Sequence, residues 1–297
     1  MWARILANRI RLASFRLTAE RGKSTAAEQS TLSGTKRTAR KSEHTNNGTL
    51  QKAILGSTEI SRAHLTPEIR LHLLTPNCPL YHAPAPSTTN GDATFAEPFW
   101  SIFWPGGQAL ARFVLDRGDE LLKDESVVLD LGAGCGAVAI AAKLRGAGHV
   151  IANDIDPVAC VAIDMNAALN DVQVSTSSEN LLAKPYKADL QPADERFDVI
   201  FVGDLLYDEE IATVLEPWLD EALRQGTRVF LGDPGRHGLT DKLRRKLRKL
   251  ETYELPDNVR RENYGFDSAT HWLYHPSFGL AHPLRISALL ELHSSFR

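Results

Sequence analysis

The stretch LDLGAGCGAVAI, residues 129–140, decides the fold class because it joins an apolar, strand-like run to a helical run through glycines at alternate positions. Asp130 lies within the apolar run, and Gly132, Gly134 and Gly136 follow it. In an open α/β sheet, a glycine-rich turn between the first strand and the first helix lies at the carboxyl edge, where such sheets bind ligands. The stretch therefore predicts a ligand-binding loop.

From residue 126 onward, short β-rich runs alternate with helical periods, which is typical of a parallel sheet covered by helices on both faces. The predicted strands are 126–132, 149–154, 172–176, 197–204, 227–233, a weaker 252–259 and 269–275. The charge-dense segment 241–250 places Leu243, Leu247 and Leu250 on one helix face, so we expect a solvated surface helix there. We therefore predict an α/β fold with a mostly parallel seven-stranded sheet.

The first 41 residues differ in composition from the rest of the chain. They contain ten Lys or Arg and two Glu, with no acidic residue before Glu20. Apolar residues recur along one helix face at Trp2, Leu6, Ile10, Ala13 and Leu17. This basic, amphipathic profile predicts a mitochondrial transit peptide over 1–41 and a location in the mitochondrial matrix. The alternative is a disordered basic tail.

The remaining residues, 42–297, carry 24 basic and 35 acidic side chains, a formal net charge of −11. Nucleic acid is an unfavourable partner for such a body, because phosphate binding needs clustered Lys and Arg. No apolar run approaches the roughly 18 residues of a membrane span. With no Cys-x-x-Cys pair and no His cluster, the sequence also predicts no metal site.

Residues 42–98 are predicted to be a linker and an N-terminal segment. The linker runs to about residue 64, and Thr66 with Pro67 predicts the start of a short helix that ends at Thr75 and Pro76. A loop follows to Glu97, and an aromatic patch with a helix opens the main domain, which we place at 99–276. The tail 277–297 has no predicted role.

Two ligands compete for the glycine loop. A dinucleotide would use Gly132, Gly134 and Ala137, with Asp154 on a ribose hydroxyl. Asp130 opposes this, because its carboxylate would repel a pyrophosphate. S-adenosylmethionine instead carries a cationic sulfonium and an ammonium, which an acidic residue attracts. A tight turn without a ligand is the third interpretation.

A second group of candidate residues follows the predicted fourth strand in FDVIFVGDLLYDEE, residues 197–210. Asp204 and Tyr207 come just past the strand end, near the expected ligand. A methyltransferase acting on amide nitrogen would be expected to show Asn-Pro-Pro-aromatic here, whereas this chain has Asp-Leu-Leu-Tyr. The competing structural role for Asp204 is the N-cap of the next helix, for which Asp208 is an equal candidate.

Together, VVLDLGAGCGAVAIAAK, ANDIDPVA and GDLLY resemble the Rossmann-like seven-strand class of methyltransferases. The Asp-x-x-Tyr is similar to the signature of its protein-lysine methyltransferase group. LTPEIRLHLLTP, WPGGQALARFVLD and RVFLGDPGR narrow the resemblance to the mitochondrial enzymes that methylate lysines of the electron transfer flavoprotein β subunit. It extends from about Leu65 to about Pro276.

The resemblance implies S-adenosylmethionine as cofactor and the flavoprotein β subunit as protein substrate. It implies a cofactor site formed by Trp104, Asp130, Gly132, Gly134, Gly136 and Asp154. From the chemistry of lysine methylation we expect Asp204 to orient the lysine nitrogen, with a share in passing its proton to water, and Tyr207 to form the pocket wall.

Two other functions remain open from the sequence. NDIDPVACVAIDMNAALND, residues 153–171, also resembles the methyltransferases that act on ribosomal proteins. A non-catalytic protein that binds the cofactor is disfavoured, because both the glycine loop and the Asp-x-x-Tyr are intact.

Overall fold

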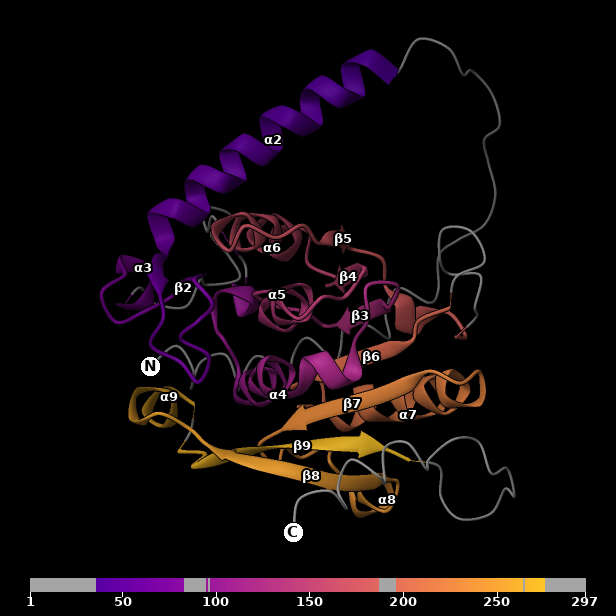
Figure 1. Ribbon diagram of the computed structural model, residues 1–297. Helices are drawn as coiled ribbons and strands as arrows, with labels where there is room; N and C mark the ends of the chain where they lie inside the picture. Colours follow the sequence, from indigo (N-terminus) through magenta and orange to yellow (C-terminus); the bar gives the residue numbers. More distant parts are fainter. Residues whose placement is uncertain (1–35, 83–94, 96, 187–195, 264, 276–297) are drawn as a thin grey trace.

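The centre of the molecule is a seven-stranded sheet with the strand order β5-β4-β3-β6-β7-β9-β8 (Figure 1). The computed structural model describes residues 36–82, 95, 97–186, 196–263 and 265–275, with side chains from residue 47 onward. The strands are β3 Val127–Leu131, β4 His149–Asn153, β5 Ser175–Ser177, β6 Val199–Gly203, β7 Arg228–Asp233, β8 Leu247–Glu254 and β9 Ser268–Tyr274. β9 is antiparallel to β7 and β8, and the other pairs are parallel. The predicted mostly parallel α/β sheet is confirmed.

Helices cover both faces of the sheet, as expected. One face packs against α4 Pro105–Leu121, α5 Ala137–Leu144 and α6 Pro157–Leu169, and the other against α7 Glu209–Arg224 and the short α8 Asp241–Arg244 (Figure 1). The remaining short elements are η2 Phe99–Ser101, η3 Leu181–Ala183 and α9 Asp257–Glu262.

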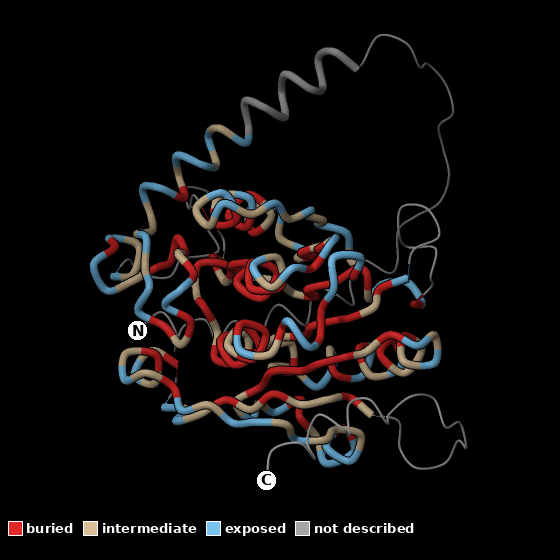
Figure 2. Tube along the Cα trace, viewed as in Figure 1, coloured by how far each residue is buried: buried red, intermediate tan, exposed pale blue. Residues whose placement is uncertain are grey.

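The alternation of side chains along β3 explains why its sequence is apolar throughout. Val128 packs into the core cluster beneath α4 and α5, whereas Val127 and Leu129 pack into the cluster beneath α7. All five residues of β3 are buried, and the central strands form the buried middle of the molecule in Figure 2. A strand covered on both faces must be apolar on both, so the polar Asp130 at its end needs a separate explanation.

Ahead of the sheet, the structure corrects two sequence predictions. Much of the predicted linker is helical, because α2 extends over Lys36–Ser57 and β1 follows at Glu59–Ser61. Near the end of α2, Ile54 packs in one core cluster with Trp100 and Val161, which ties the helix to the main domain.

The helix predicted after Thr66 does not form. A turn closed by Ile69 N–H on the Thr66 carbonyl leads into β2 Leu71–Leu73, which pairs with β1, and α3 follows at Pro79–His82. Pairing with β1 and burial of Leu71 in the core outweigh the local helix signal.

The predicted surface helix over 241–250 is also wrong beyond its first turn. The chain leaves α8 at Arg244 and continues as edge strand β8, which takes the place of the weaker strand predicted at 252–259. Leu247 packs against the cluster under α7 and Leu250 against the cluster under α4, on opposite sides of the sheet. The helical spacing of the leucines was therefore incidental, and pairing with β9 decided the conformation.

The predicted transit peptide falls largely outside the described residues, and the 277–297 tail does so entirely. Among the helices that the structure describes, none is long and apolar enough to cross a membrane.

Candidate functional site

The two groups of predicted site residues meet at one edge of the sheet. β3 lies between β4 and β6, so the strand order runs in one direction from β3 to β5 and in the opposite direction from β3 through β6 and β7. Open α/β sheets bind ligands at such a topological switch point. The glycine loop leaves the carboxyl end of β3, Asp154 follows β4, and Asp204 follows β6.

The glycine loop is held in a conformation that favours glycine. Gly132, Gly134 and Gly136 have φ values of +70°, +54° and +77°, all in the left-handed region. A Cβ on Gly132 would lie 2.6 Å from Leu205, and one on Gly136 would lie 2.9 Å from Ile163. A Cβ on Gly134 would meet no atom within 4 Å, so at this glycine the loop faces open space.

Asp130 lies behind the loop and is almost completely buried. Its Oδ2 accepts a hydrogen bond of 3.0 Å from the Ala139 amide in the first turn of α5, where a carboxylate complements the helix dipole. Burial raises the pKa of Asp130 to about 7, and the charge of Asp154 acts in the same direction. A cationic ligand nearby would favour the ionised form.

Asp154 connects the end of β4 to the glycine loop. Its Oδ2 accepts from the Gly134 amide at 2.9 Å and its Oδ1 from the Asp156 amide at 3.0 Å. Each carboxylate oxygen can accept more than one hydrogen bond, so Asp154 retains the capacity to accept from ribose hydroxyls.

Asp204 is held in place by both its backbone and its side chain. Its φ of +56° lies in the left-handed region, which is uncommon for a non-glycine residue and points to a functional constraint. Oδ2 accepts from the Gly107 amide at 2.8 Å, and Oδ1 accepts from Nε of Arg236 at 2.8 Å. Nη2 of Arg236 also lies 2.8 Å from Oδ1, as part of the ion pair. The side chain is 7% exposed.

The helix-capping alternative for Asp204 is wrong, because Asp208 caps α7. Its side chain accepts from the Glu210 amide at 2.7 Å. Asp204 is therefore free of that structural role.

Trp-Pro-Gly-Gly, residues 104–107, brings the start of α4 against the ends of β6 and β7. A Cβ on Gly106 would lie 2.1 Å from the Gly232 carbonyl oxygen, and one on Gly203 would lie 3.0 Å from Gly107 Cα. The close backbone contact explains the glycines and delivers the Gly107 amide to Asp204. Sequence reasoning noted the motif and gave these glycines no role.

Trp104 caps the start of α4, and its indole N–H donates to the Phe99 carbonyl at 3.1 Å. Its ring lies 5.3 Å from the guanidinium carbon of Arg236. Arg236 is a residue that the sequence analysis missed, although it ends the Gly-Asp-Pro-Gly-Arg stretch that supported the resemblance.

Tyr207 follows Asp204 by three positions and is partly buried. Burial raises the pKa of its hydroxyl to about 12, and the charge of Asp154 acts in the same direction. The tyrosine is therefore protonated at neutral pH and can act as a hydrogen-bond donor.

One small cavity collects most of the predicted residues. Its lining consists of Ile102, Phe103, Trp104, Gly107, Asp130, Gly132, Ala133, Gly134, Cys135, Ala137, Val138, Gly203 and Asp204. Gly136, Asp154 and Tyr207 are not part of the lining, although Asp154 is hydrogen-bonded to Gly134 of the loop. Trp104, the glycine loop and Asp204 thus share one site.

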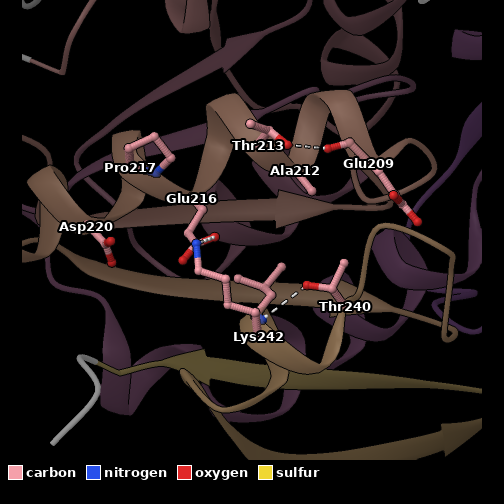
Figure 3. A pocket seen from close by; sticks show the side chains of 9 residues that line it. Glu209, Ala212, Thr213, Glu216, Pro217, Asp220, Thr240 and Lys242 are labelled. Atoms are coloured by element: carbon pink, nitrogen blue, oxygen red, sulfur yellow. Dashed lines mark hydrogen bonds and ion pairs between the residues drawn. The ribbon is translucent and has the colours of Figure 1, made fainter.

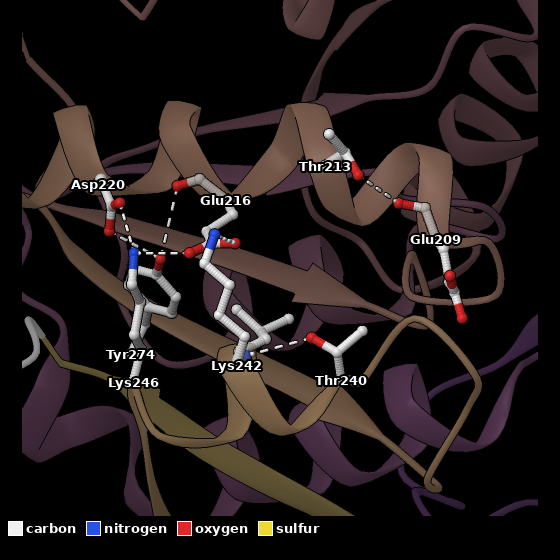
Figure 4. Close-up of polar contacts among 9 residues, drawn as sticks. Glu209, Thr213, Glu216, Asp220, Thr240, Lys242, Lys246 and Tyr274 are labelled. Carbon is white, nitrogen blue, oxygen red and sulfur yellow. Dashed lines mark hydrogen bonds and ion pairs between the residues drawn. The ribbon is translucent and has the colours of Figure 1, made fainter.

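A second, larger groove lies between α7 and α8 (Figure 3). Three of its charged side chains are paired: Lys242 with Glu216, and Glu216 and Asp220 with the neighbouring Lys246, while the Tyr274 hydroxyl donates to Asp220 (Figure 4). Because these groups already satisfy each other, we assign the groove no role in the reaction.

The residues of this site suit S-adenosylmethionine. The open space at Gly134 admits a ligand against the loop backbone, Asp154 supplies acceptors for hydroxyls, and the buried Asp130 suits a cation better than a phosphate. In the described part of the chain, no group of three or more His, Cys, Asp and Glu side chains could hold a metal ion.

The sheet order and this loop define a Rossmann-like, S-adenosylmethionine-dependent methyltransferase. A family model described as ribosomal protein L11 methyltransferase (PrmA) matches residues 108–230. Electron transfer flavoprotein beta subunit lysine methyltransferase of Danio rerio is 43% identical over 231 residues, which cover 76% of this chain and 83% of that protein. The Homo sapiens protein of the same name is 40% identical over 224 residues, 74% of this chain and 80% of that protein. The chain belongs to the family of electron transfer flavoprotein β subunit lysine methyltransferases.

Among solved structures, ribosomal protein L11 methylase from Lactobacillus delbrueckii subsp. bulgaricus matches with a TM-score of 0.40 and 22% sequence identity, covering 62% of this chain and 90% of that chain. Family membership also decides between the two ligands considered for the glycine loop: S-adenosylmethionine is the cofactor.

Proposed function

We propose that this protein transfers methyl groups from S-adenosylmethionine to lysine side chains of the electron transfer flavoprotein β subunit in the mitochondrial matrix. The observation that carries the proposal is the position of Asp204 in the wall of the cavity that the glycine loop also lines. Relatives that share about three quarters of this chain carry that activity in their names.

The reaction is an in-line displacement, and S-adenosylmethionine supplies an electrophilic methyl group on its sulfonium. The attacking lysine must be a neutral amine, because an ammonium has no free electron pair. With an ordinary pKa of about 10.4, roughly one lysine in a thousand is neutral near pH 7.4. The site therefore has to position that minor form efficiently.

In this proposal Asp204 accepts a hydrogen bond from an N–H of the lysine. This bond directs the electron pair of the lysine nitrogen toward the loop side of the cavity. Gly107 and Arg236 fix the carboxylate from behind, so it is already oriented when the substrate arrives. Orientation of this kind lowers a barrier by about 7 kcal/mol in well-aligned cases. Tyr207 narrows the approach, and Trp104 covers the cofactor.

Transfer of a tritiated methyl group from S-adenosylmethionine to the purified flavoprotein β subunit, with the full-length protein as enzyme, tests the assignment. Labelling of that subunit, lost when its lysines are changed to arginine, is the expected result. An unlabelled subunit would contradict the substrate assignment.

A ribosomal protein substrate is the second candidate, favoured by the match of residues 108–230 to the L11 methyltransferase model. Labelling a mitochondrial extract separates the candidates by the identity of the labelled band. No labelled protein at all would support the non-catalytic interpretation. Import of a fluorescent protein fused behind residues 1–41 tests the matrix location independently.

A further inference from the structure

The turn after β7 places a buried arginine against Asp204. The Arg236 side chain is 10% exposed, and both its Nε and Nη2 lie 2.8 Å from Oδ1 of Asp204. Its guanidinium carbon lies 5.3 Å from the ring of Trp104 and 5.7 Å from the ring of Phe266. One hydrogen bond, the ion pair and two aromatic rings therefore fix the cation beside Asp204.

The backbone of the turn also holds Arg236 in place. Gly203 of β6 pairs with Gly232 of β7, so Asp204 and Asp233 follow each other at neighbouring strand ends. Oδ1 of Asp233 accepts from the amides of Gly235 at 2.6 Å and Arg236 at 2.7 Å. Gly235, with φ of +104°, closes the turn in a conformation that suits glycine.

This arrangement changes what Asp204 offers to a lysine. A lone buried carboxylate would attract the ammonium form and hold it, which opposes methyl transfer. With Arg236 in contact, Asp204 and Arg236 together carry no net charge, and the guanidinium repels a second cation at the same carboxylate. Arg236 therefore makes Asp204 less attractive to an ammonium than it would be alone. A neutral amine meets no such repulsion and can still donate an N–H to Asp204.

The other charged groups around this position do not replace Arg236. Asp233 faces the pair from β7, Asp130 lines the same cavity as Asp204, and Asp154, Asp208 and Glu97 act on the neighbouring Tyr207. All of these are acidic, so Arg236 is the cation that the described residues place against Asp204.

We propose that Arg236 is a positioning residue that makes Asp204 select and orient the neutral amine of the substrate lysine. The inference rests on the proposed lysine methyltransfer. The lysine first loses a proton to water. The nitrogen lone pair then forms the N–CH₃ bond as the S–CH₃ bond breaks, and the electron pair of that bond stays on sulfur as S-adenosylhomocysteine leaves.

The test is the pH dependence of kcat for the full-length enzyme, Arg236→Gln and Arg236→Lys, with the flavoprotein β subunit as substrate. Gln keeps a donor for Asp204 without the charge, and Lys keeps the charge without the planar guanidinium. In Arg236→Gln we expect the rise of kcat with pH to occur about one to two pH units higher than in the wild type. The reason is that an unpaired Asp204 carboxylate favours the ammonium form of the substrate lysine.

At pH 7.4 this shift corresponds to a loss of about 10- to 100-fold in kcat, largely recovered at pH 9.5, without a rise in KM. For Arg236→Lys we expect the rise of kcat with pH to stay within about half a unit of the wild type and kcat to fall only a few-fold. Melting temperature and S-adenosylmethionine affinity, measured beside the rates, detect a merely structural loss.

A loss of kcat in Arg236→Gln that is equal at every pH would overturn the proposal. If Arg236→Gln does not fold, the pH dependence of the wild-type enzyme still tests the proposal. The pH at which wild-type kcat is half-maximal must then lie below the ordinary lysine pKa of about 10.4. A half-maximal pH at or above that value refutes the proposal. Absence of any wild-type transfer to the β subunit contradicts the proposed substrate instead, so the two failures are distinguishable.

Discussion

The cavity has two sides that are held by different forces. The loop after β3 is shaped by backbone conformation, with three glycines at positive φ and amides bonded to Asp154 and the Asn153 carbonyl. The opposite side, after β6 and β7, is held by buried charges: Asp204 against Arg236, with Asp233 fixing the turn. The loop selects a ligand by its shape, because it is formed by the backbone. The charged pair can instead distinguish the neutral amine of a lysine from its ammonium form.

The two sides should therefore fail in different ways. Changes in the loop are expected to weaken cofactor binding, and changes in the charge pair to reduce turnover while the cofactor still binds. The four predictions below test this difference.

The largest effect is expected for Asp204→Asn. We expect methyl transfer to fall by at least about 100-fold, because the charge and the proton-accepting capacity are lost. Affinity for S-adenosylmethionine should change less than about 3-fold, since the loop is untouched. Initial rates with the flavoprotein β subunit and calorimetry with the cofactor measure both quantities.

The same variant leaves Arg236 buried without its partner, which costs about 3 kcal/mol. Its melting temperature should drop by about 6–12 °C, so the rates must be taken where the variant is folded. Near-normal turnover in the folded, cofactor-binding variant would remove Asp204 from the catalytic residues.

The second effect contrasts two glycines of the loop. Gly134→Val is expected to weaken cofactor binding by at least about 10-fold, because its side chain would point into the open space where the ligand would lie. The φ of +54° also strains a β-branched residue, so some stability is lost as well, but no neighbour has to move. Gly136→Val is the matched control. Its Cβ would meet Ile163 at 2.9 Å, so the loss should appear in stability. Calorimetry and thermal melts on both variants test the contrast, and wild-type affinity in Gly134→Val would argue against the proposed site.

The third effect is a pH dependence of cofactor binding at Asp130. With a pKa of about 7 in the free protein, Asp130 is mostly protonated at pH 6 and must lose that proton to pair with a cation. Affinity for S-adenosylmethionine should therefore rise by about 5- to 10-fold between pH 6 and 7.5, with proton release on binding. Titration calorimetry in two buffers of different ionisation enthalpy measures both.

Asp130→Asn provides the control, because an amide does not titrate in this range. A wild-type affinity that is flat across the same range would show that Asp130 does not sense the charge of the cofactor. The contribution of Asp130 to folding has the opposite sign: its raised pKa stabilises the fold at low pH, and this stability is lost as pH rises from about 4 to 7.

The smallest effect is expected for Asp208→Ala, four residues from Asp204. Loss of the hydrogen bond to the Glu210 amide removes the α7 cap and should cost about 1 kcal/mol of stability. The melting temperature should fall by about 2–4 °C, while turnover stays within about 2-fold of the wild type. A strong loss of activity would mean that Asp208, not only Asp204, contributes to the reaction.

Much of the core was predictable from local sequence. The apolar runs of β3, β6 and β7 are hydrophobic on both faces because helices cover both, and this pattern is visible without any structure. Predictions failed where contacts from distant segments overrode the local pattern. Residues 71–73 join β1 instead of a helix, and Leu247 and Leu250 join the edge strand β8.

For the site, the sequence by itself determined the glycine loop, its acidic neighbours Asp130 and Asp154, and the candidacy of Asp204, since each lies at a strand end that periodicity can locate. Only the tertiary structure decided that Asp208 caps α7 and that Asp204 is bonded to Gly107 and Arg236. Arg236 is 32 positions from Asp204 in the chain. Their contact depends on the parallel register of β6 with β7. That register is set by contacts across the whole sheet, so no short stretch of sequence predicts it.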